Sequence, residues 1–138
     1  MKLVVDSNIF VSSYYYGGNP KRVIHRILDG LDKLYVSSEV LDEIEEVLNR
    51  PKFNGNKTDI NSFMDSIKKV AIFTYPSEQI KASRDIKDNK YLECAVAANA
   101  NYIVSGDIHL LELKKHNEII ILKAKEYLDI VESLDKKR

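Results

Sequence analysis

The sequence predicts an α/β fold, a three-layer α/β/α sandwich with a mainly parallel central sheet. Two observations lead to this prediction. Short apolar runs typical of strands alternate along the chain with longer segments in which apolar residues recur at helical spacing. The connections between these segments are short, which favours strand–helix–strand units, and such units build a parallel sheet covered by helices on both faces.

The first half of the chain is expected to contain two strand–helix pairs. A strand at 3–5 precedes a break at 14–20, which contains two glycines and a proline, and the apolar spacing then predicts a helix over 23–31. A second strand at 34–36 leads into a helix over 38–50, because a serine stands at its N-cap position and a proline follows it.

The second half repeats the alternation. In chain order, the apolar patterns predict a helix at 60–69, a strand at 70–75, a helix at 88–99, a strand at 102–105, a short helix through 110–113, a strand at 119–122 and a final helix at 124–134. Residues 135–138 are all charged and are expected to form a frayed end.

Composition limits the functional class. The 138 residues fit one domain, 1–138, and the content of 44% hydrophobic and 30% charged residues is that of an ordinary globular protein with no apolar run as long as a membrane span. Asp6 interrupts the first apolar stretch, so no signal peptide is expected, and the single Cys94 cannot form an internal disulfide. Both observations favour a cytoplasmic protein. The net charge of zero neither indicates nor excludes a nucleic-acid partner.

Two of the predicted strands are followed by an aspartate, Asp6 after the first and Asp107 after the strand at 102–105. Parallel strands end at one edge of the sheet, where open α/β folds place their ligand sites. Neighbouring carboxylates repel each other, so a cation between them is expected. Asn8 and Ser105 stand beside the two acids and could orient them by hydrogen bonds; the alternatives are a helix cap for Asn8 and a local backbone contact for Ser105.

Helical periodicity brings further acids close to the predicted core. Asp88 falls inside the apolar sector of its helix, although an ordinary N-cap or first-turn aspartate has the same pattern. In the helix over 38–50, Glu43 and Glu45 lie equally far from the centre of the apolar stripe, on opposite flanks. Periodicity narrows the five acids of this helix to these two and does not choose between them, and a charged rim beside the core remains the alternative.

Four segments of the chain, in order and at suitable spacing, resemble the motifs of the PIN domain. This nuclease family includes the toxin components of many prokaryotic toxin–antitoxin pairs (VapC-like). The similar segments are Val4–Asn8, Ser38–Phe53, Arg84–Ala95 and Tyr102–Asp107. The resemblance covers residues 2–131, selects Glu43 as the acid of the second motif, and implies that Asp6, Glu43, Asp88 and Asp107 form one catalytic site.

This resemblance implies a metal-dependent endoribonuclease. Carboxylate ligands without cysteine suit Mg²⁺ or Mn²⁺, with Asp6 and Asp107 as direct ligands and Asp88 in or close to the first coordination shell. Glu43 is expected to hold or deprotonate the attacking water. The implied partners are RNA, a protein antitoxin and a second copy in a homodimer, with no membrane. A PIN nuclease that processes RNA without being a toxin is the alternative within the family.

The chain departs from many relatives in two places. A proline and a further acid are replaced by Ile86 and Lys87, and a second aspartate after the fourth motif is replaced by His109, so the resemblance supplies no outer metal ligand there. The four core acids are unaffected. Arg84, Lys87 and Lys90 are candidate contacts to the RNA backbone.

Two other functions fit the sequence less well. A phosphate-accepting signalling domain requires an aspartate after a middle strand, where this chain has Ser37. An inactive scaffolding domain predicts the loss of at least one core acid, and all four are present. The Tyr14–Tyr16 segment is expected either to stack on RNA bases or, more ordinarily, to pack on the body of the protein.

Overall fold

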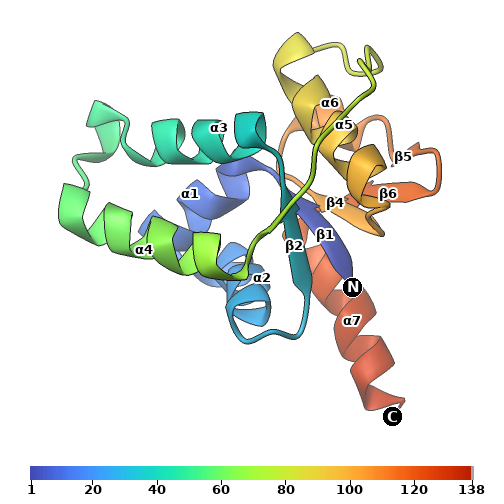
Figure 1. Cartoon of the computed structure of the whole chain (residues 1–138). Coiled ribbons are helices and arrows are strands. Elements are labelled where there is room, and N and C mark those ends of the chain that lie inside the picture. The colour runs from blue at the N-terminus through green and yellow to red at the C-terminus, as the bar shows by residue number, and fades with distance from the viewer. Residues whose placement is uncertain (138) are drawn as a thin grey trace.

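The structure, a computed structural model, describes residues 1–137. Within them six strands form one sheet: β1 (Lys2–Val5), β2 (Lys33–Val36), β3 (Ile72–Phe73), β4 (Tyr102–Val104), β5 (Lys115–His116) and β6 (Ile119–Leu122). The strand order is β3-β2-β1-β4-β6-β5 (Figure 1). All neighbouring strands run parallel except β5, which pairs antiparallel with β6. The predicted fold class, with its mainly parallel central sheet, is confirmed.

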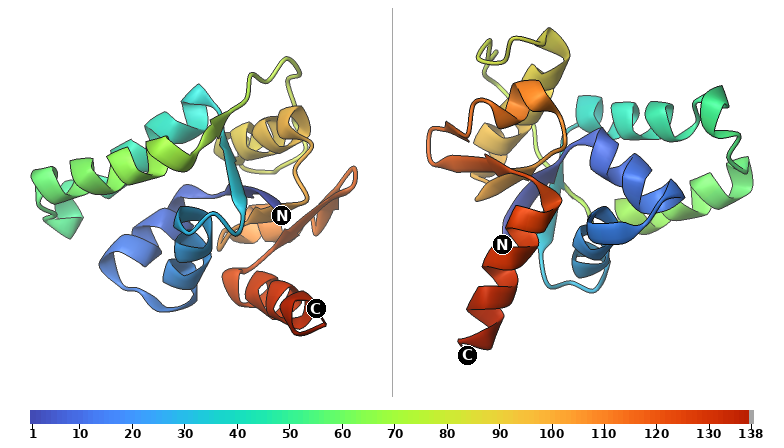
Figure 2. Two further views of the ribbon diagram at one scale, coloured as in Figure 1. Left: turned by 60° about the horizontal axis from the view of Figure 1, so that its bottom comes forward. Right: turned by 180° about the vertical axis from the view of Figure 1, so that it is seen from behind.

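The helices are α1 (Ser7–Tyr15), α2 (Gly18–Leu28), α3 (Ser38–Leu48), α4 (Lys57–Val70), α5 (Asn89–Ala98), α6 (Ile108–Leu111) and α7 (Ala124–Lys136), with single 3₁₀ turns at Pro51–Phe53 and Ile86–Asp88. Helix α5 packs on β1, β2 and β4 from one side of the sheet, whereas α2 and α7 pack together on the other side (Figure 2). Helices α3 and α4 extend away from the sheet as an arm (Figure 1).

Central strands buried on both faces explain why their sequences read as continuous apolar runs. Leu3, Val4 and Val5 in β1 are fully or almost fully buried. The helix after β2 begins where the serine pattern predicts, because the Ser37 hydroxyl accepts a hydrogen bond from the backbone N–H of Val40 at 3.2 Å. These strands and caps fix the carboxyl edge of the sheet, where the acids lie.

The largest difference from the sequence prediction is α1, which the pattern of apolar residues did not indicate. Residues 7–15 are helical, so the expected break at 14–20 is shorter, and Tyr14 and Tyr15 belong to the helix. The Tyr15 ring stacks on Phe53 at 4.7 Å, and the Tyr14 ring lies 5.1 Å from Phe63. These two tyrosines hold α1 against the α3–α4 arm, which agrees with the packing alternative.

Smaller differences occur at element ends. The strand expected at 70–75 is only Ile72–Phe73, since α4 continues to Val70, and helix α2 ends at Leu28 rather than near residue 31. The two-residue strand β5 has too few residues to show a period. Helix α7 runs to Lys136, so the expectation of a frayed end at 135–138 is wrong for its first two residues, while Arg138 lies outside the described residues.

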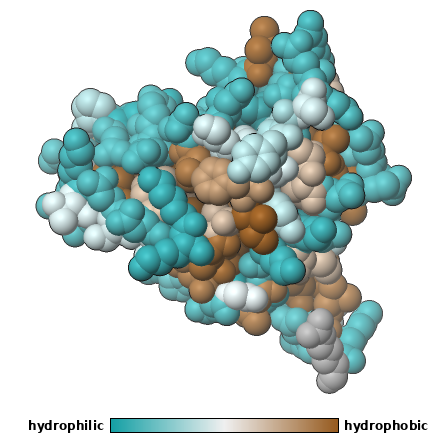
Figure 3. All heavy atoms as spheres, viewed as in Figure 1, coloured by the Kyte–Doolittle hydropathy of each residue, from teal (hydrophilic) through white to brown (hydrophobic). Residues whose placement is uncertain are grey.

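The surface is mostly polar over the α3–α4 arm, whereas apolar side chains gather near the middle of the face in Figure 3. The edge strand β3 contributes Ile72 and Phe73, which are 39% and 44% exposed. None of the helices within residues 1–137 has both the length and the apolarity needed to cross a membrane.

Candidate functional site

The candidate site lies where β1 and β4 end side by side. Val5 pairs with Val104, and the backbone N–H of Asp6 donates to the carbonyl of Val104 at 2.9 Å. Asp6 and Ser105 are therefore neighbours although 99 residues separate them, and both are buried. Asp107 follows two residues later and is partly exposed. The strand register thus brings the two strand-end acids to the same edge of the sheet.

Hydrogen bonds join the two strand ends. The Ser105 hydroxyl donates to Asp6 Oδ2 at 2.6 Å and accepts from the backbone N–H of Asp107 at 2.9 Å. The Asn8 amide donates to Asp6 Oδ2 at 3.3 Å and accepts from the backbone N–H of Gly106 at 3.2 Å. Asn8 and Ser105 therefore hold the Asp6 carboxylate and the backbone before Asp107 in a fixed relation.

A third segment adds two aspartates to this edge. Asp85, Asp88 and Asp107 each place one carboxylate oxygen within 4.8 Å of the others. Asp88 stands at the N-cap position of α5, as the capping alternative expects, but its side chain makes no capping hydrogen bond within the described chain, so capping does not satisfy its carboxylate. The residue is 6% exposed, and its Oδ2 atom has no hydrogen-bond partner among residues 1–137. A buried carboxylate oxygen without a partner is costly and therefore indicates a missing cation or proton.

Burial and mutual repulsion change the acidity of these groups. Burial is the main factor that raises the pKa of Asp88 to about 7, and the charges of Asp107, Asp6 and Asp85 raise it further. Burial likewise raises the pKa of Asp6; the hydrogen bond from Ser105 lowers it, and the charges of Glu43 and Asp107 raise it. The acids are thus close enough to affect one another's ionisation.

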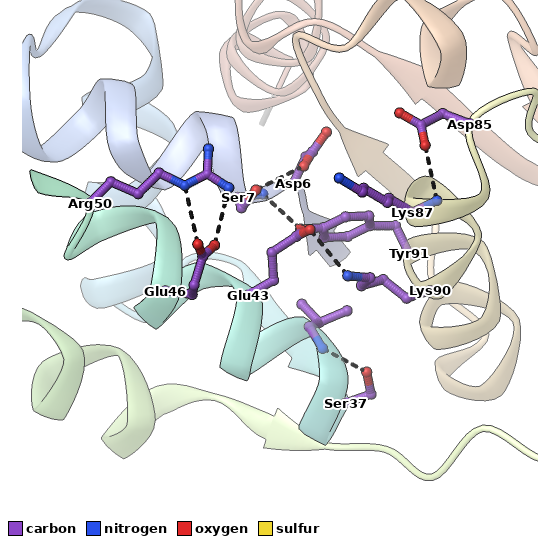
Figure 4. Close-up of polar contacts among 11 residues, drawn as sticks. Asp6, Ser7, Ser37, Glu43, Glu46, Arg50, Asp85, Lys87, Lys90 and Tyr91 are labelled. Atoms are coloured by element: carbon purple, nitrogen blue, oxygen red, sulfur yellow. Dashed lines mark hydrogen bonds and ion pairs between the residues drawn. The ribbon is translucent and has the colours of Figure 1, made fainter. Parts of the chain in front are cut away.

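Glu43 points from α3 toward this site (Figure 4). Its Oε1 accepts from the Lys90 ammonium at 3.1 Å, and its Oε2 accepts from the Tyr91 hydroxyl. The Tyr91 hydroxyl in turn accepts from the backbone N–H of Ser7 at 3.1 Å. One turn of the helix away from the site, Glu46 pairs with Arg50 (Figure 4). Of the two candidates that periodicity left open, Glu43 is the one whose charge reaches Asp6.

Sequence reasoning missed two residues here. Tyr91 belongs to the apolar face of its helix and its ring is buried, but its hydroxyl links Glu43 to the start of α1. The available signal was that a buried tyrosine hydroxyl usually needs a polar partner. Asp85 could not be assigned to the acid site by helical periodicity, because it precedes α5. The signal in the sequence was its position three residues before Asp88.

Of the three candidate RNA contacts, Lys90 lies at the acid site, whereas Arg84 and Lys87 are exposed. Lys90 lies at the site through its ion pair with Glu43. Arg84 is largely exposed and pairs with Glu112 at 2.9 Å, and the Lys87 side chain is exposed while its backbone N–H donates to Asp85 at 3.0 Å. The half-exposed His109 donates its backbone N–H to Asp107 Oδ1 at 2.7 Å.

The donors at this edge fit a divalent cation that prefers oxygen. Three aspartates offer one oxygen each within a short span, one of these aspartates is buried with an unpartnered oxygen, and Asp6 lies beside them. Carboxylate-only donors of this kind suit a hard ion such as Mg²⁺ or Mn²⁺. Binding such an ion would also replace the proton that the raised pKa of Asp88 retains near neutral pH.

The acidity of Asp88 predicts how stability depends on pH without metal. The pKa of Asp88 is raised from 3.8 to about 7, so the folded protein binds more protons than the unfolded chain between these two pH values. The folded protein therefore loses stability as the pH rises from 3.8 to about 7. In EDTA, Asp88→Asn is expected to raise Tm at pH 8 by about 5 °C, the shift that roughly 1 to 2 kcal/mol produces in a domain of this size. The gain should largely disappear at pH 4.5.

Thermal melts of both proteins at the two pH values measure this difference. Asp65→Asn, at an exposed position of α4, is the matched control and should change Tm equally at both pH values. A gain for Asp88→Asn that does not depend on pH would contradict the assignment of the raised pKa to this carboxylate.

Comparisons with known proteins agree with this fold. A family model described as the PIN domain matches residues 2–109. An uncharacterised protein of Methanocaldococcus jannaschii is 29% identical over 127 residues, covering 87% of this chain and 79% of that protein. The crystal structure of VapBC2 from Rickettsia felis, bound to a DNA fragment from its promoter, has a similar fold with a TM-score of 0.58. It is 15% identical and covers 88% of this chain and 97% of that chain.

Proposed function

Since the chain belongs to the PIN domain family, we propose that it is a metal-dependent endoribonuclease that hydrolyses phosphodiester bonds of RNA at the site formed by β1, β4, α3 and α5. PIN domains are generally nucleases, and these nucleases generally use divalent metals. The observation that carries the proposal is the state of Asp88. Its Oδ2 is buried and has no hydrogen-bond partner within the described residues, and one oxygen of its carboxylate lies within 4.8 Å of one oxygen each of Asp85 and Asp107.

Asp6, Asp88 and Asp107 are the proposed ligands of Mg²⁺ or Mn²⁺, and Asp85 extends this set. An ion held there supplies Lewis-acid chemistry to a phosphate oxygen and lowers the pKa of bound water. Ser105 and Asn8 keep Asp6 in place through their hydrogen bonds, so its carboxylate needs little rearrangement when the cation is present.

Glu43 is the proposed base or orienting group for the attacking water. Its carboxylate is held from one side by Tyr91, whose hydroxyl is itself fixed by the backbone of Ser7. Lys90 neutralises Glu43 from the other side and is partly exposed, so its ammonium can also meet a phosphate of the substrate. Proton removal by a positioned carboxylate is a common source of rate enhancement in hydrolysis.

We extend the proposal to a biological role as the toxin of a toxin–antitoxin pair, neutralised by a protein antitoxin and acting as a homodimer. Support comes from the four motifs and from the fold shared with VapBC2, a complex whose crystals contained promoter DNA. A PIN nuclease of RNA processing uses the same site and is the second candidate. Arrest of growth on expression in a bacterial host, relieved by the product of an adjacent gene, supports the toxin role; normal growth favours the processing role.

The activity is tested with labelled single-stranded RNA and DNA of one sequence. Wild-type protein is expected to cleave the RNA when Mg²⁺ or Mn²⁺ is added, to lose this cleavage in EDTA, and to leave the DNA intact. Restoring activity with excess Mn²⁺ after EDTA shows that the loss came from the metal and not from unfolding. Cleavage that continues undiminished in EDTA would rule out the metal-dependent mechanism. Preferential cleavage of DNA would rule out RNA as the substrate.

A further inference from the structure

A groove beside the acid site is not used by the proposed chemistry. It lies between the strap, defined here as residues 74–85 that connect β3 to the turn before α5, and the N-terminal ends of α3 and α5. Figure 1 shows the strap passing between these helices. We propose that this strap groove binds one unpaired base of single-stranded RNA next to the cleaved phosphate. This inference rests on the proposed nuclease function.

The groove has a suitable size and position. Its volume is about 820 Å³, within the range of sites that bind small organic groups. Lys90 lies on the boundary, because it lines the groove while its ammonium contacts Glu43 of the acid site at 3.1 Å. Glu39, which also lines the groove, stands one helical turn before Glu43 on α3. An RNA strand leaving the acid site past Lys90 therefore enters the strap groove.

Polar groups in the groove can read the edge of a base. Ser83 is 7% exposed, and its hydroxyl has no partner in the part of the chain that the structure describes. The Asn89 carbonyl oxygen accepts from the backbone N–H of Ser83 at 2.9 Å, which leaves the amide NH₂ of this residue to serve as a donor. Ser38 and Glu39 begin α3, where the first backbone N–H groups lack helical acceptors. Such paired donors and acceptors match the hydrogen-bonding edges of nucleobases.

Apolar surfaces on the strap side are suited to stacking. Tyr75 and Ile86 both line the groove and are each 83% exposed, the highest exposure among the large hydrophobic side chains. An aromatic ring presented to solvent next to a polar groove is the usual platform for an unstacked base. Tyr14 and Tyr15, by contrast, are engaged in packing against the α3–α4 arm.

The charges favour a base rather than a phosphate inside the groove. Glu93 accepts a hydrogen bond from the backbone N–H of Ile80 at 2.8 Å and so holds the strap, which leaves one of its carboxylate oxygens engaged within the protein. Glu39 and Glu78 remain and would repel a phosphate, but their carboxylates can accept from the N–H groups of a base. Lys81 and Lys90 are available for the flanking backbone.

The test is abasic scanning of a cleaved RNA. Oligonucleotides that lack one base at a time around the cleavage site are compared by kcat/KM, using wild-type protein and Tyr75→Ala. For wild-type protein, kcat/KM is expected to fall about tenfold when the base at one particular position is missing, and to stay unchanged when any other base is missing. On intact RNA, Tyr75→Ala is expected to have a kcat/KM about tenfold below that of wild-type protein, through a higher KM, which is the size expected for one stacked base. The two losses should not add, because both remove the same contact. Ser83→Ala is expected to weaken the preference at that position.

Leu31→Ala is the control, since Leu31 is a large side chain that is 60% exposed in the turn between α2 and β2 and lines no part of the strap groove. It should behave as wild type on every oligonucleotide. The base site would be overturned if the losses of kcat/KM from the missing base and from Tyr75→Ala were additive, or if a missing base lowered kcat/KM equally in both proteins. Either result would leave the nuclease function intact. Unchanged RNA cleavage by Tyr75→Ala, together with lost inhibition by a protein antitoxin, would instead assign the groove to a protein. If wild-type protein cleaves no RNA, the proposed function itself fails.

Discussion

Asp6→Asn is expected to lower the rate of RNA cleavage by about 100- to 1,000-fold at saturating Mn²⁺, the scale seen when one electrostatic contact to the reacting centre is removed. The substitution keeps the shape of the side chain and can keep its contacts with Ser105 and Asn8, but it removes a buried negative charge that faces the other acids. The loss should therefore come from weaker cation binding and lower kcat rather than from unfolding. Asp107→Asn is expected to have an effect of the same order.

Single-turnover cleavage and Mn²⁺ titration by calorimetry measure these two consequences separately. Asp42→Asn removes an exposed acid from α3, the helix that also carries Glu43, and is the control for a general change of charge. Ser105→Ala should give an intermediate loss of about 10- to 100-fold, because it releases Asp6 without removing its charge. Near wild-type cleavage by folded Asp6→Asn protein would remove Asp6 from the mechanism.

Glu43→Gln is the second variant with a large expected effect, a fall in kcat of about 100-fold or more, as for the loss of a positioned general base. Glu45→Gln is an unusually close control, since both glutamates flank the apolar stripe of α3 and only Glu43 meets Tyr91 and Lys90. Glu45→Gln should leave kcat unchanged. The measurement is kcat and KM on a short RNA over a range of pH, where loss of a base also removes the rise of kcat with pH.

Tyr91→Phe refines this prediction by removing only the hydroxyl that holds Glu43. We expect a smaller fall in kcat than for Glu43→Gln, with little change in KM. Tyr127→Phe is the matched control, because Tyr127 is also a fully buried tyrosine but lies in α7 beside Tyr102. Equal losses of activity in the two tyrosine variants would indicate a general packing defect instead of a role in positioning Glu43.

Much of the fold was predictable because its central strands are buried on both faces and most of its helices are amphipathic. The elements that were missed lack such a signal: α1 carries serines among its apolar residues and is packed on several sides, and β5 has two residues. The strand-end acids Asp6 and Asp107 were accessible from the sequence because parallel strands share a carboxyl edge.

The remaining site residues depend on contacts between segments far apart in the chain. Periodicity could not separate Glu43 from Glu45, since the choice depends on which flank of α3 faces α5. Tyr91 was hidden because one side chain serves both the core and the site, and Asp85 because it lies in irregular backbone. Side-chain direction in such places is decided by tertiary packing, which a single sequence does not reveal.

The hydrogen bond that joins Asp6 to Ser105 also determines at which stage of synthesis and folding the site can form. It connects residues 99 positions apart, and the pairing of β1 with β4 that creates it requires the helices and strands in between to be folded or at least looped out. A growing or partly unfolded chain therefore carries the individual acids without the site that they form together. Local unfolding between the two strands would likewise separate Asp6 from Ser105 while leaving every acid present.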